Sequence, residues 1–382
     1  MLAVSTQPDV ISFAGGLPAP ELFPVDDLRA AFDAVLSTDG PGALQYGPTE
    51  GYAPLRAYLT NRLAHRGIMT KPEDILITSG SQQGLDLLSK VLLHARPSVL
   101  VEAPSYVGAL QAFASHESRY LAVPMDDQGM CVESATQMLN HVMSTSEDRP
   151  ALLYTIATFQ NPSGVTISRE RRLALLEFCA AQQIPLVEDD PYGELRYEGE
   201  EVPPLRALPG GEETIYLGTF SKILAPGLRL GWIVAPQSVI ARLVISKQAA
   251  DLHTDSLVQR AVLHYCMHTD IEEHLSHLRA VYRSRRDAML SALADYFPSE
   301  VKWTRPDGGF FIWVTFPEGT DTRALFAEAL AQRVAFVPGT AFFMDHLGSN
   351  CLRLNFSHVE PARIVEGMQR LAKVVTAHSS KT

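Results

Sequence analysis

Short apolar runs recur through the first two thirds of the chain, and most are continuously hydrophobic rather than alternating with polar residues. Continuous runs of this length are typical of strands buried on both faces of a parallel sheet. Helix-like segments lie between several of them, so the order of elements predicts an α/β wound sheet. The runs predicted as strands are Ile75–Thr78, Ser98–Ala103, Arg119–Val123, Ala151–Ile156, Pro185–Asp189, Thr214–Gly218 and Leu230–Ala235.

The pattern changes to helical periodicity after Ala235 and returns to β-rich segments after Val301. The segment Ile271–Phe297 is long and charged along one side, as expected of a helix that links two domains. Earlier in the chain, Ser168 precedes an amphipathic stretch and is a predicted helix cap. The sequence therefore predicts a large, mostly parallel wound-sheet domain followed by a smaller α+β domain.

Composition narrows the class of protein. The formal net charge of −11 argues against a nucleic-acid partner, because such domains are usually basic. The four cysteines lie far apart and show no metal-ligand spacing, so we expect reduced thiols. No run approaches the roughly 18 apolar residues that span a bilayer, and the N-terminus lacks a signal-peptide pattern. We expect a soluble, cytoplasmic protein with no membrane partner and no metal.

Ligands of open α/β sheets bind at the carboxyl ends of strands, so the residues that follow each predicted strand are candidates. Ser81 and Gln82 open a helix after the first strand, where backbone N–H groups and the helix dipole favour a phosphate. Taken alone, this segment is more simply interpreted as an ordinary helix cap. Tyr106 follows the second strand and is suited to stacking on a flat ring, although a packed tyrosine is the simpler interpretation.

Two further strands are followed by polar side chains. Asn161 lies in "FQNPSG", where it is either a turn residue or a donor to a ligand oxygen. Asp189 and Asp190 end an apolar strand, and Tyr192 follows three residues after Asp189. A buried carboxylate needs a positive partner, such as a protonated ring nitrogen; the alternative places both aspartates in solvent.

The segment "GTFSKILAPGLRLGW" holds Lys222 just after a predicted strand. A desolvated lysine near other cations loses proton affinity and becomes a nucleophilic amine. Arg229 has the planar fork that binds phosphate, and Thr219 and Ser221 offer hydroxyl groups. Taken together, the residues at these strand ends predict a site for a flat, phosphorylated pyridine that carries an aldehyde.

The chain resembles the fold-type I pyridoxal 5′-phosphate (PLP) enzymes of the class I/II aminotransferase superfamily, and within it the α-aminoadipate/kynurenine aminotransferase-like branch. The resemblance spans residues 11–357 and is carried by a set of motifs. These are "ISFAGGLPAPELFP", "QYGPTEGYAPLR", "TSGSQQGLDLL", "APSY", "FQNPSG", "VEDDPYGEL", "TFSKILAPGLRLGW", "KQAADLHT", "VAFVPG" and "LRLNFS".

The resemblance implies a role for each matching residue. Lys222, Asp189 and Tyr192 match the catalytic group: the lysine that binds the cofactor aldehyde, the aspartate that pairs with the ring nitrogen, and a donor to the ring hydroxyl oxygen. Asn161 matches a second donor to that oxygen. The remaining matches to cofactor ligands are the stacking Tyr106 and the phosphate ligands Ser81, Gln82, Thr219, Ser221 and Arg229.

Substrate contacts and assembly are implied in the same way. Arg353 matches the arginine that clamps the substrate α-carboxylate, with Asn161 and Gly16 bordering the substrate. Tyr46 matches a tyrosine that reaches the cofactor phosphate of the other subunit, which implies a homodimer with shared active sites. The expected organisation is an N-terminal segment, 1–40, that belongs with the small domain and the substrate entrance, a PLP-binding domain, 41–280, and a small domain, 281–382.

The implied function is a ping-pong transaminase that moves the α-amino group of an L-amino acid to 2-oxoglutarate or pyruvate. One alternative is the same cofactor with β-elimination, decarboxylation or oxidation as the outcome, because fold does not fix reaction type. Another is a non-enzymatic regulator, in which an aminotransferase-like domain follows a basic winged-helix domain. The acidic composition and the short segment before "ISFAGG" argue against the regulator hypothesis, and we expect an enzyme. The sequence leaves the side chain of the amino donor open.

Overall fold

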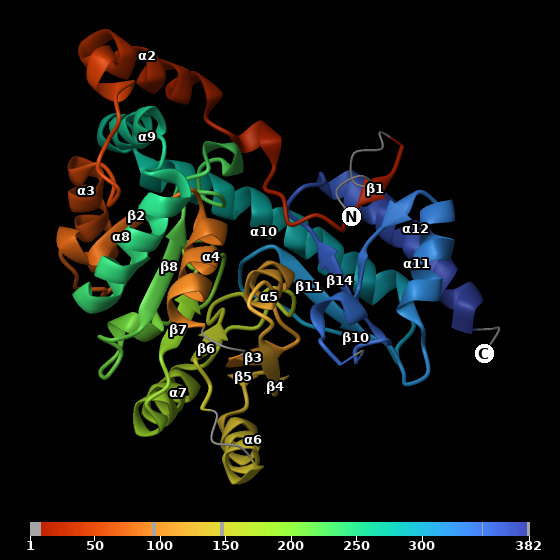
Figure 1. Cartoon of the computed structure of the whole chain (residues 1–382). Helices are drawn as coiled ribbons and strands as arrows, with labels where there is room; N and C mark the ends of the chain where they lie inside the picture. Colours follow the sequence, from red (N-terminus) through yellow and green to blue (C-terminus); the bar gives the residue numbers. More distant parts are fainter. Residues whose placement is uncertain (1–8, 94–96, 146–148, 346, 380–382) are drawn as a thin grey trace.

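An eight-stranded sheet organises the first two thirds of the chain in the computed structural model, which describes residues 9–93, 97–145, 149–345 and 347–379 (Figure 1). Its strand order is β2-β9-β8-β7-β6-β3-β4-β5. These strands are β2 (Ile75–Thr78), β3 (Ser98–Ala103), β4 (Arg119–Asp126), β5 (Gly129–Met130), β6 (Leu152–Thr155), β7 (Leu186–Asp189), β8 (Ile215–Thr219) and β9 (Gly231–Val234).

The strand predictions are confirmed, with bounds that agree to within three residues. Neighbouring strands from β8 through β7, β6 and β3 to β4 are parallel, as predicted. The sheet is nevertheless mixed, because β9 runs antiparallel to both β8 and β2, and β5 runs antiparallel to β4. An apolar run fits a central strand of either direction, so hydrophobicity does not reveal this reversal.

Helices cover both faces of this sheet, which explains the continuous apolar runs. Leu100 and Leu153 pack in a core with residues of α6 and α7. Val99 and Val101, their neighbours on the opposite face, pack in a core with residues of α4, α5 and α8. The helices of this part are α2 (Val25–Ala43), α3 (Ala53–Ala64), α4 (Ser81–Leu92), α5 (Val107–Ala114), α6 (Val132–Thr145), α7 (Arg169–Gln182), α8 (Gln237–Asp251) and α9 (Ser256–His268).

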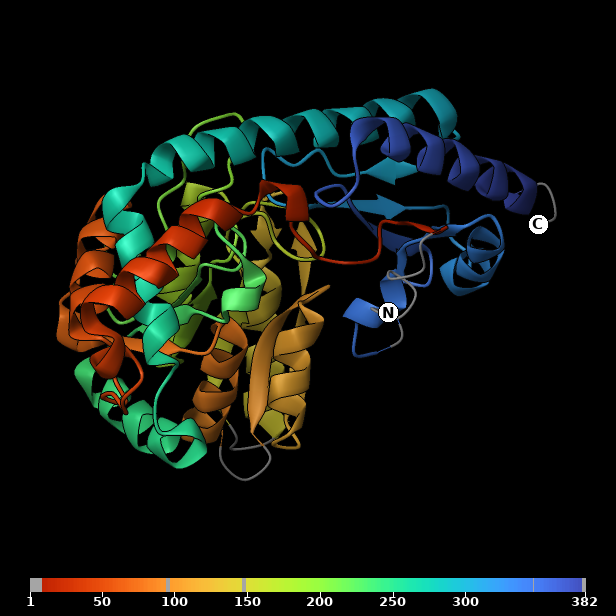
Figure 2. The same ribbon diagram turned by 90° about the horizontal axis from the view of Figure 1, so that it is seen from above.

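A smaller α+β part follows, built on the antiparallel sheet β10-β11-β14-β13. Its strands are β10 (Lys302–Trp303), β11 (Phe311–Thr315), β13 (Val337–Pro338) and β14 (Cys351–Asn355), with helices α11 (Thr322–Ala331) and α12 (Pro361–Ser379). The helix α10 (Ile271–Tyr296) runs from the eight-stranded sheet to this part (Figure 2). Its 26 residues give it a length of about 39 Å.

The N-terminal segment contacts both parts of the molecule. Strand β1 (Ile11–Ser12) pairs in parallel with β12 (Val334–Ala335) of the C-terminal part, whereas α2 lies along α9 (Figure 1). The domain boundaries expected at residues 40 and 280 stay predictions. The short 3-10 turns are η1 (Pro20–Leu22), η2 (Pro72–Asp74), η3 (Leu205–Ala207), η4 (Pro226–Leu228) and η5 (Gly339–Phe342).

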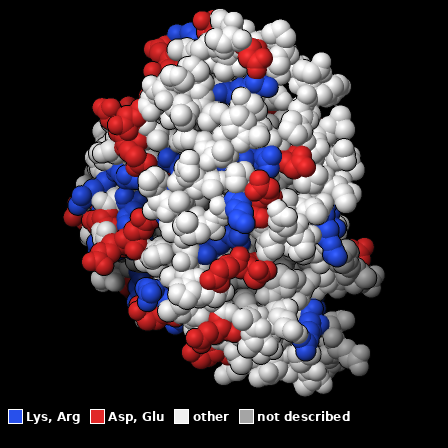
Figure 3. Space-filling model, turned by 90° about the vertical axis from the view of Figure 1, so that its left-hand side faces the viewer, with Lys and Arg blue, Asp and Glu red and all other residues white. Residues whose placement is uncertain are grey.

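Charged side chains of both signs share the surface. Acidic and basic residues are interspersed on the face in Figure 3 rather than gathered into one basic patch. No helix in the described ranges combines the length and the apolar character that crossing a bilayer requires.

Helix α7 contains a buried cation that hydrophobic periodicity does not predict. Ser168 caps the helix as predicted, because the backbone N–H of Arg171 donates to its hydroxyl oxygen at 3.2 Å. Arg172, one residue later, is fully buried. Its guanidinium donates to the carbonyl oxygens of residues 157, 167 and 203, and it lies 3.9 Å from the buried carboxylate of Glu188. This side chain ties two loops to the helix, the one between β6 and α7 and the one that precedes η3.

Arg172→Leu is expected to lower the free energy of unfolding by about 3–5 kcal/mol, because it leaves Glu188 buried without its cation and strands several carbonyl groups. The exposed Arg169 on the same helix is the matched control, and Arg169→Leu is expected to change stability by no more than about 0.5 kcal/mol. Urea unfolding of both variants measures the difference. Equal losses in the two variants would contradict the assigned role of Arg172.

Candidate active site

A cavity of about 370 Å³ lies where the carboxyl ends of the parallel strands face the C-terminal part of the chain. The loops that follow β2, β3, β6, β7 and β8 converge on it, together with the N-terminal segment and β14. Every predicted site residue except Tyr46 lines this cavity. They are Gly16, Ser81, Gln82, Tyr106, Asn161, Asp189, Tyr192, Thr219, Ser221, Lys222, Arg229 and Arg353.

Lys222 stands three residues beyond the end of β8 and reaches across the cavity to the N-terminal segment. Its Nζ donates a hydrogen bond to the carbonyl oxygen of Gly16 at 2.8 Å. Burial, together with the nearby charges of Arg353 and Arg229, lowers the pKa of Lys222 to about 8, against the opposing effect of Asp189. The amine is therefore poised to be neutral, and hence nucleophilic, in mildly alkaline solution.

Asp189 is the last residue of β7 and is buried, so the alternative of a solvent-exposed loop cap is wrong. Its Oδ2 accepts a hydrogen bond from the hydroxyl of Tyr154 at 2.9 Å, while its Oδ1 is buried without a hydrogen-bond partner among the described residues. Burial, with a smaller effect of Asp190, raises the pKa of Asp189 to about 7. An unpaired buried carboxylate oxygen on the cavity wall fits a protonated ring nitrogen.

Asp190 is also buried but turns to a different set of partners. It accepts hydrogen bonds from the backbone N–H of Gly193 at 2.9 Å, from Arg66 at 2.7 Å and from the Tyr216 hydroxyl at 2.9 Å. The two adjacent carboxylates thus have separate environments, and Asp189 is the one that lines the cavity.

Arg353 lies on β14 and is 7% exposed, so it is a buried cation rather than a surface one. Its guanidinium lies 4.2 Å from the ring centre of Phe311 and 5.0 Å from that of Phe342. It donates to the Asn161 side-chain oxygen at 2.8 Å and to the Ala14 carbonyl oxygen at 2.6 Å. Burial lowers its pKa to about 10. Its Nε is buried without a hydrogen-bond partner among the described residues, so an anionic ligand fits this position.

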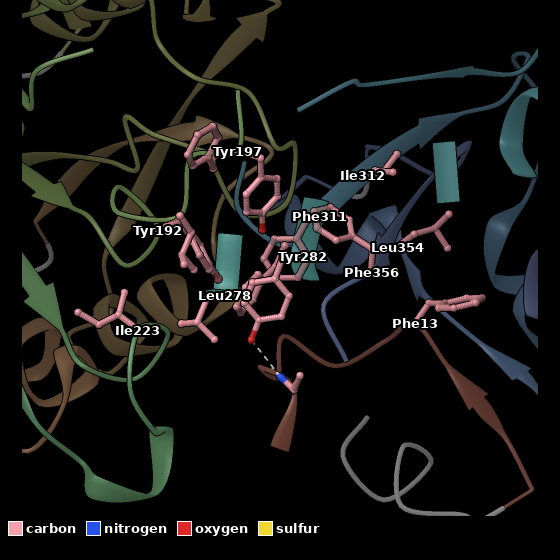
Figure 4. Close-up of a cluster of buried hydrophobic side chains, with 14 of the residues drawn as sticks. Phe13, Tyr192, Tyr197, Ile223, Leu278, Tyr282, Phe311, Ile312, Leu354 and Phe356 are labelled. Atoms are coloured by element: carbon pink, nitrogen blue, oxygen red, sulfur yellow. Dashed lines mark hydrogen bonds between the residues drawn. The ribbon is translucent and has the colours of Figure 1, made fainter. Parts of the chain in front are cut away.

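Tyr192, an aromatic residue of the cavity wall, belongs to a larger apolar cluster (Figure 4). Tyr192 is buried, and its ring centre lies 5.8 Å from that of Phe311, in an edge-on arrangement. Burial raises the pKa of the Tyr192 phenol, which therefore stays a hydrogen-bond donor at neutral pH. Tyr106 precedes α5 at the cavity wall, and burial raises the pKa of its phenol as well.

The opposite end of the cavity is rich in donors. Ser81 begins α4, and Gly80 before it has a φ of +80°, which favours glycine. A Cβ at Gly80 would lie 2.6 Å from an Arg229 guanidinium nitrogen, so the backbone and this side chain are in close contact. The hydroxyl oxygens of Thr219 and Ser221 are 2.9 Å apart. A helix N-terminus, two hydroxyls and a guanidinium form a suitable anion site.

A main-chain contact joins the two sides of the cavity. The backbone N–H of Ser105, in the loop after β3, donates to the carbonyl oxygen of Phe342, in η5, at 3.0 Å. Gln82 makes a second local contact, because its side-chain amide donates to the Gly108 carbonyl oxygen at 2.9 Å. The first of these contacts holds the two sides of the cavity together near Tyr106 and Arg353.

Comparison with known proteins identifies the family. Residues 9–371 match the family model for aminotransferase class I and II. The chain belongs to the class I and II aminotransferases. This aminotransferase is 45% identical over 374 residues to aromatic-amino-acid aminotransferase 1 of Thermococcus litoralis, a match that covers 98% of this chain and 89% of that protein.

Two solved structures extend the comparison. Pyrococcus horikoshii kynurenine aminotransferase in complex with PMP is 44% identical, with a TM-score of 0.94 over 98% of this chain and 93% of that one. The α-aminoadipate aminotransferase of Thermus thermophilus, complexed with N-(5′-phosphopyridoxyl)-L-leucine, is 42% identical, with a TM-score of 0.90 over 98% and 94%. The predicted branch, the fold type, PLP dependence and the assignment as a transaminase are confirmed.

Tyr46 lies outside the cavity. Its side chain is 78% exposed, and its ring lies edge-on to that of His253 with 5.8 Å between centres. Tyr154, by contrast, contacts Asp189 and was not predicted from the sequence. It lies within a strand rather than at its end, and a tyrosine in an apolar run is normally a packing residue. The phenol group is the signal that distinguishes it from its neighbours in the run.

The lowered pKa of Lys222 leads to a pH-dependent prediction. In the cofactor-free protein, reductive methylation of Lys222 by formaldehyde and cyanoborohydride should accelerate as pH rises and become half-maximal near pH 8, because only the neutral amine reacts. Mass spectrometry of the Lys222 peptide measures the rate. Arg353→Leu removes one of the charges that lower this pKa and should shift the midpoint upward. A wild-type midpoint near 10.5 would contradict the assigned environment.

Proposed function

We propose that this aminotransferase moves the α-amino group of an L-amino acid with an apolar or aromatic side chain to 2-oxoglutarate or pyruvate, in two half-reactions of a ping-pong cycle. One observation carries the proposal. The amine of Lys222, the open carboxylate oxygen of Asp189 and the guanidinium of Arg353 share one cavity. Burial disfavours the charge of each group, and a phosphorylated pyridine together with an amino acid provides complementary charges.

The residues are proposed to hold the cofactor in the roles that the sequence suggests. Asp189 pairs with the ring nitrogen through Oδ1, while Tyr154 holds its other oxygen. Tyr192 and Asn161 donate to the ring oxygen, and Tyr106 covers a face of the ring. The phosphate ligands are Ser81, Gln82, Thr219, Ser221 and Arg229.

When bound, PLP supplies an aldehyde that takes up the amino group and a conjugated ring that stabilises negative charge at the substrate Cα. Lys222 would hold the aldehyde end of the cofactor. The neutral Nζ of Lys222 would also take the proton from the substrate Cα as a general base. Arg353 binds the α-carboxylate and so fixes the substrate with Cα towards that amine. The second half-reaction uses the same residues in reverse order.

The preference for an apolar side chain rests on what surrounds Arg353. Val107, Val337 and Phe342 line this end of the cavity. The cations among the described lining residues are Lys222, Arg229 and Arg353, and each already has a proposed partner. A second, distal carboxylate on the substrate would therefore lie against apolar side chains without a cation, which costs desolvation free energy.

Arg353→Ala, tested against a panel of aromatic, branched and acidic amino donors, examines this proposal. Loss of the clamp should reduce kcat/KM for amino acid and oxo acid alike by about 30-fold to 5000-fold, since removing one partner of such a pair costs about 2–5 kcal/mol. Cofactor occupancy should be nearly unchanged, because the phosphate is assigned to Arg229. The wild-type enzyme should prefer aromatic and branched donors.

The exposed Arg363 of α12 provides the control, and Arg363→Ala should leave both half-reactions unaltered. Unchanged half-reactions in Arg353→Ala would contradict the clamp. A wild-type preference for acidic donors would contradict the proposed side-chain class. Release of 2-oxo acid and ammonia without an acceptor would show a different reaction outcome.

We further propose that the enzyme works as a cytoplasmic homodimer in which Tyr46 reaches the phosphate site of the partner. Leu44, Tyr46 and Leu252 are exposed by 72%, 78% and 50% in the single chain, and an apolar group of this kind is typical of an interface. A second copy of the chain covers these side chains in this proposal. The cytoplasmic assignment rests on the four cysteines, which are free thiols.

Intersubunit complementation tests the dimer. Tyr46→Ala should weaken PLP binding, and Lys222→Ala should abolish transamination. Co-expression of the two variants should restore one intact site in each mixed dimer, which combines Lys222 from one subunit with Tyr46 from the other. We expect the mixed sample to be active with near wild-type PLP affinity. Neither variant alone should show this combination. An active monomer in sedimentation equilibrium would sink the proposal.

A further inference from the structure

The motif "KQAADLHT", residues 247–254, lies outside the cavity, and none of the cofactor or substrate roles proposed above uses it. It forms the end of α8 and the loop that follows. Lys247, its first residue, is fully buried, whereas lysine is almost never buried without a partner. Its partners therefore indicate what the side chain holds in place.

Lys247 belongs to a closed group of hydrogen bonds with Asp251 and Gln83. Its Nζ donates to both carboxylate oxygens of Asp251 at 2.8 Å and to the Gln83 Oε1 at 2.9 Å. The Gln83 amide nitrogen donates to Asp251 Oδ2 at 2.6 Å. Because each member contacts the other two, the orientation of the Gln83 side chain is fixed in this group.

Gln83 connects this group to the backbone that precedes α4. Its Oε1 also accepts a hydrogen bond from the backbone N–H of Ser79 at 2.8 Å. The carbonyl oxygen of Ser79 accepts a hydrogen bond from Arg229 at 3.2 Å. Both peptide groups of Ser79 are therefore held, one by Gln83 and one by the arginine that lines the phosphate end of the cavity. Gly80 and Ser81 follow directly and begin the helix.

We propose that Lys247 is a positioning residue for the cofactor phosphate: through Gln83 it fixes the backbone of Ser79–Ser81, and with it the contact to Arg229. The inference rests on the proposed assignment of the phosphate to Ser81 and Arg229. Its charge stays paired within the group, so Lys247 acts on the phosphate through geometry. Preorganised donors bind an anion more tightly because their ordering does not have to occur on binding.

The chain offers a matched lysine for comparison. Lys90 and Asp86 form an i,i+4 salt bridge on α4 at 2.7 Å. Lys247 and Asp251 have the same spacing in sequence and a similar distance of 2.8 Å. Lys90 and Asp86 are each 43% exposed, and neither lines the cavity. A Lys→Met change removes an ammonium group at either position. Only the ammonium group of Lys247 is connected to Ser79, through Gln83.

The affinity of the cofactor-free, full-length enzyme for PLP relative to pyridoxal, which lacks the phosphate, tests the proposal. Equilibrium dialysis should show that the wild type prefers PLP. Lys247→Met should reduce this preference by about 10-fold to 100-fold, the loss expected for a hydrogen bond to a charged group, with pyridoxal affinity retained. Lys90→Met should retain the full preference.

Gln83→Leu is the second variant, because it breaks the connection to Ser79 and keeps the pair of Lys247 with Asp251. We expect the same loss of preference for PLP over pyridoxal. If Lys247→Met does not fold, Gln83→Leu alone tests the positioning role. An unchanged preference in Gln83→Leu, or an equal loss of PLP and pyridoxal affinity in both variants, would overturn the positioning role. A wild-type enzyme without preference for PLP would instead overturn the phosphate assignment on which the inference rests.

Discussion

Desolvation of charged groups in one cavity is the constraint on which the rest of this structure depends. Burial lowers the pKa of Lys222 and Arg353 and raises that of Asp189, so each group is shifted towards its neutral form. Burying an ionisable group without a partner costs desolvation free energy. Such groups are typical of functional sites, where a ligand provides the opposite charge. The arrangement of strands, loops and helices around the cavity serves to hold these groups apart and oriented.

Side chains far apart in sequence reach this cavity because the two sheets face each other across it. The loop after β8 provides Lys222, and β14 of the second sheet provides Arg353. The N-terminal segment lies between them and contributes carbonyl oxygens, from Gly16 to Lys222 and from Ala14 to Arg353. A cation that is paired with a neutral carbonyl stays available to an anion, because the carbonyl offers orientation without full charge compensation.

The strands and the residues at their ends are predictable from the sequence. Continuous apolar runs mark the strands, and ligands of α/β sheets bind at the carboxyl ends of strands, so both predictions need only the local order of residues. Ile75–Thr78 and Ser98–Ala103 were predicted with the bounds that the structure shows. The reversed direction of β9 was missed, because an apolar run has no direction. Arg172 and Lys247 were missed as buried cations, since each has carbonyl or amide partners that lie far along the chain. The place of Arg353 near Asn161 came from resemblance to a family, which periodicity alone does not provide.

The contact between Ser105 and Phe342 has a consequence for how such a site changes over evolutionary time. It joins a backbone N–H to a backbone carbonyl, so it does not depend on which side chains stand at these two positions. Substitution at residue 342 alters the wall of the cavity and leaves this bridge across it in place. The contact that encloses the cavity therefore depends on the backbone, whereas the shape of the cavity wall depends on side chains. A lineage is free to explore new amino donors by side-chain replacement while the enclosing geometry is inherited unchanged.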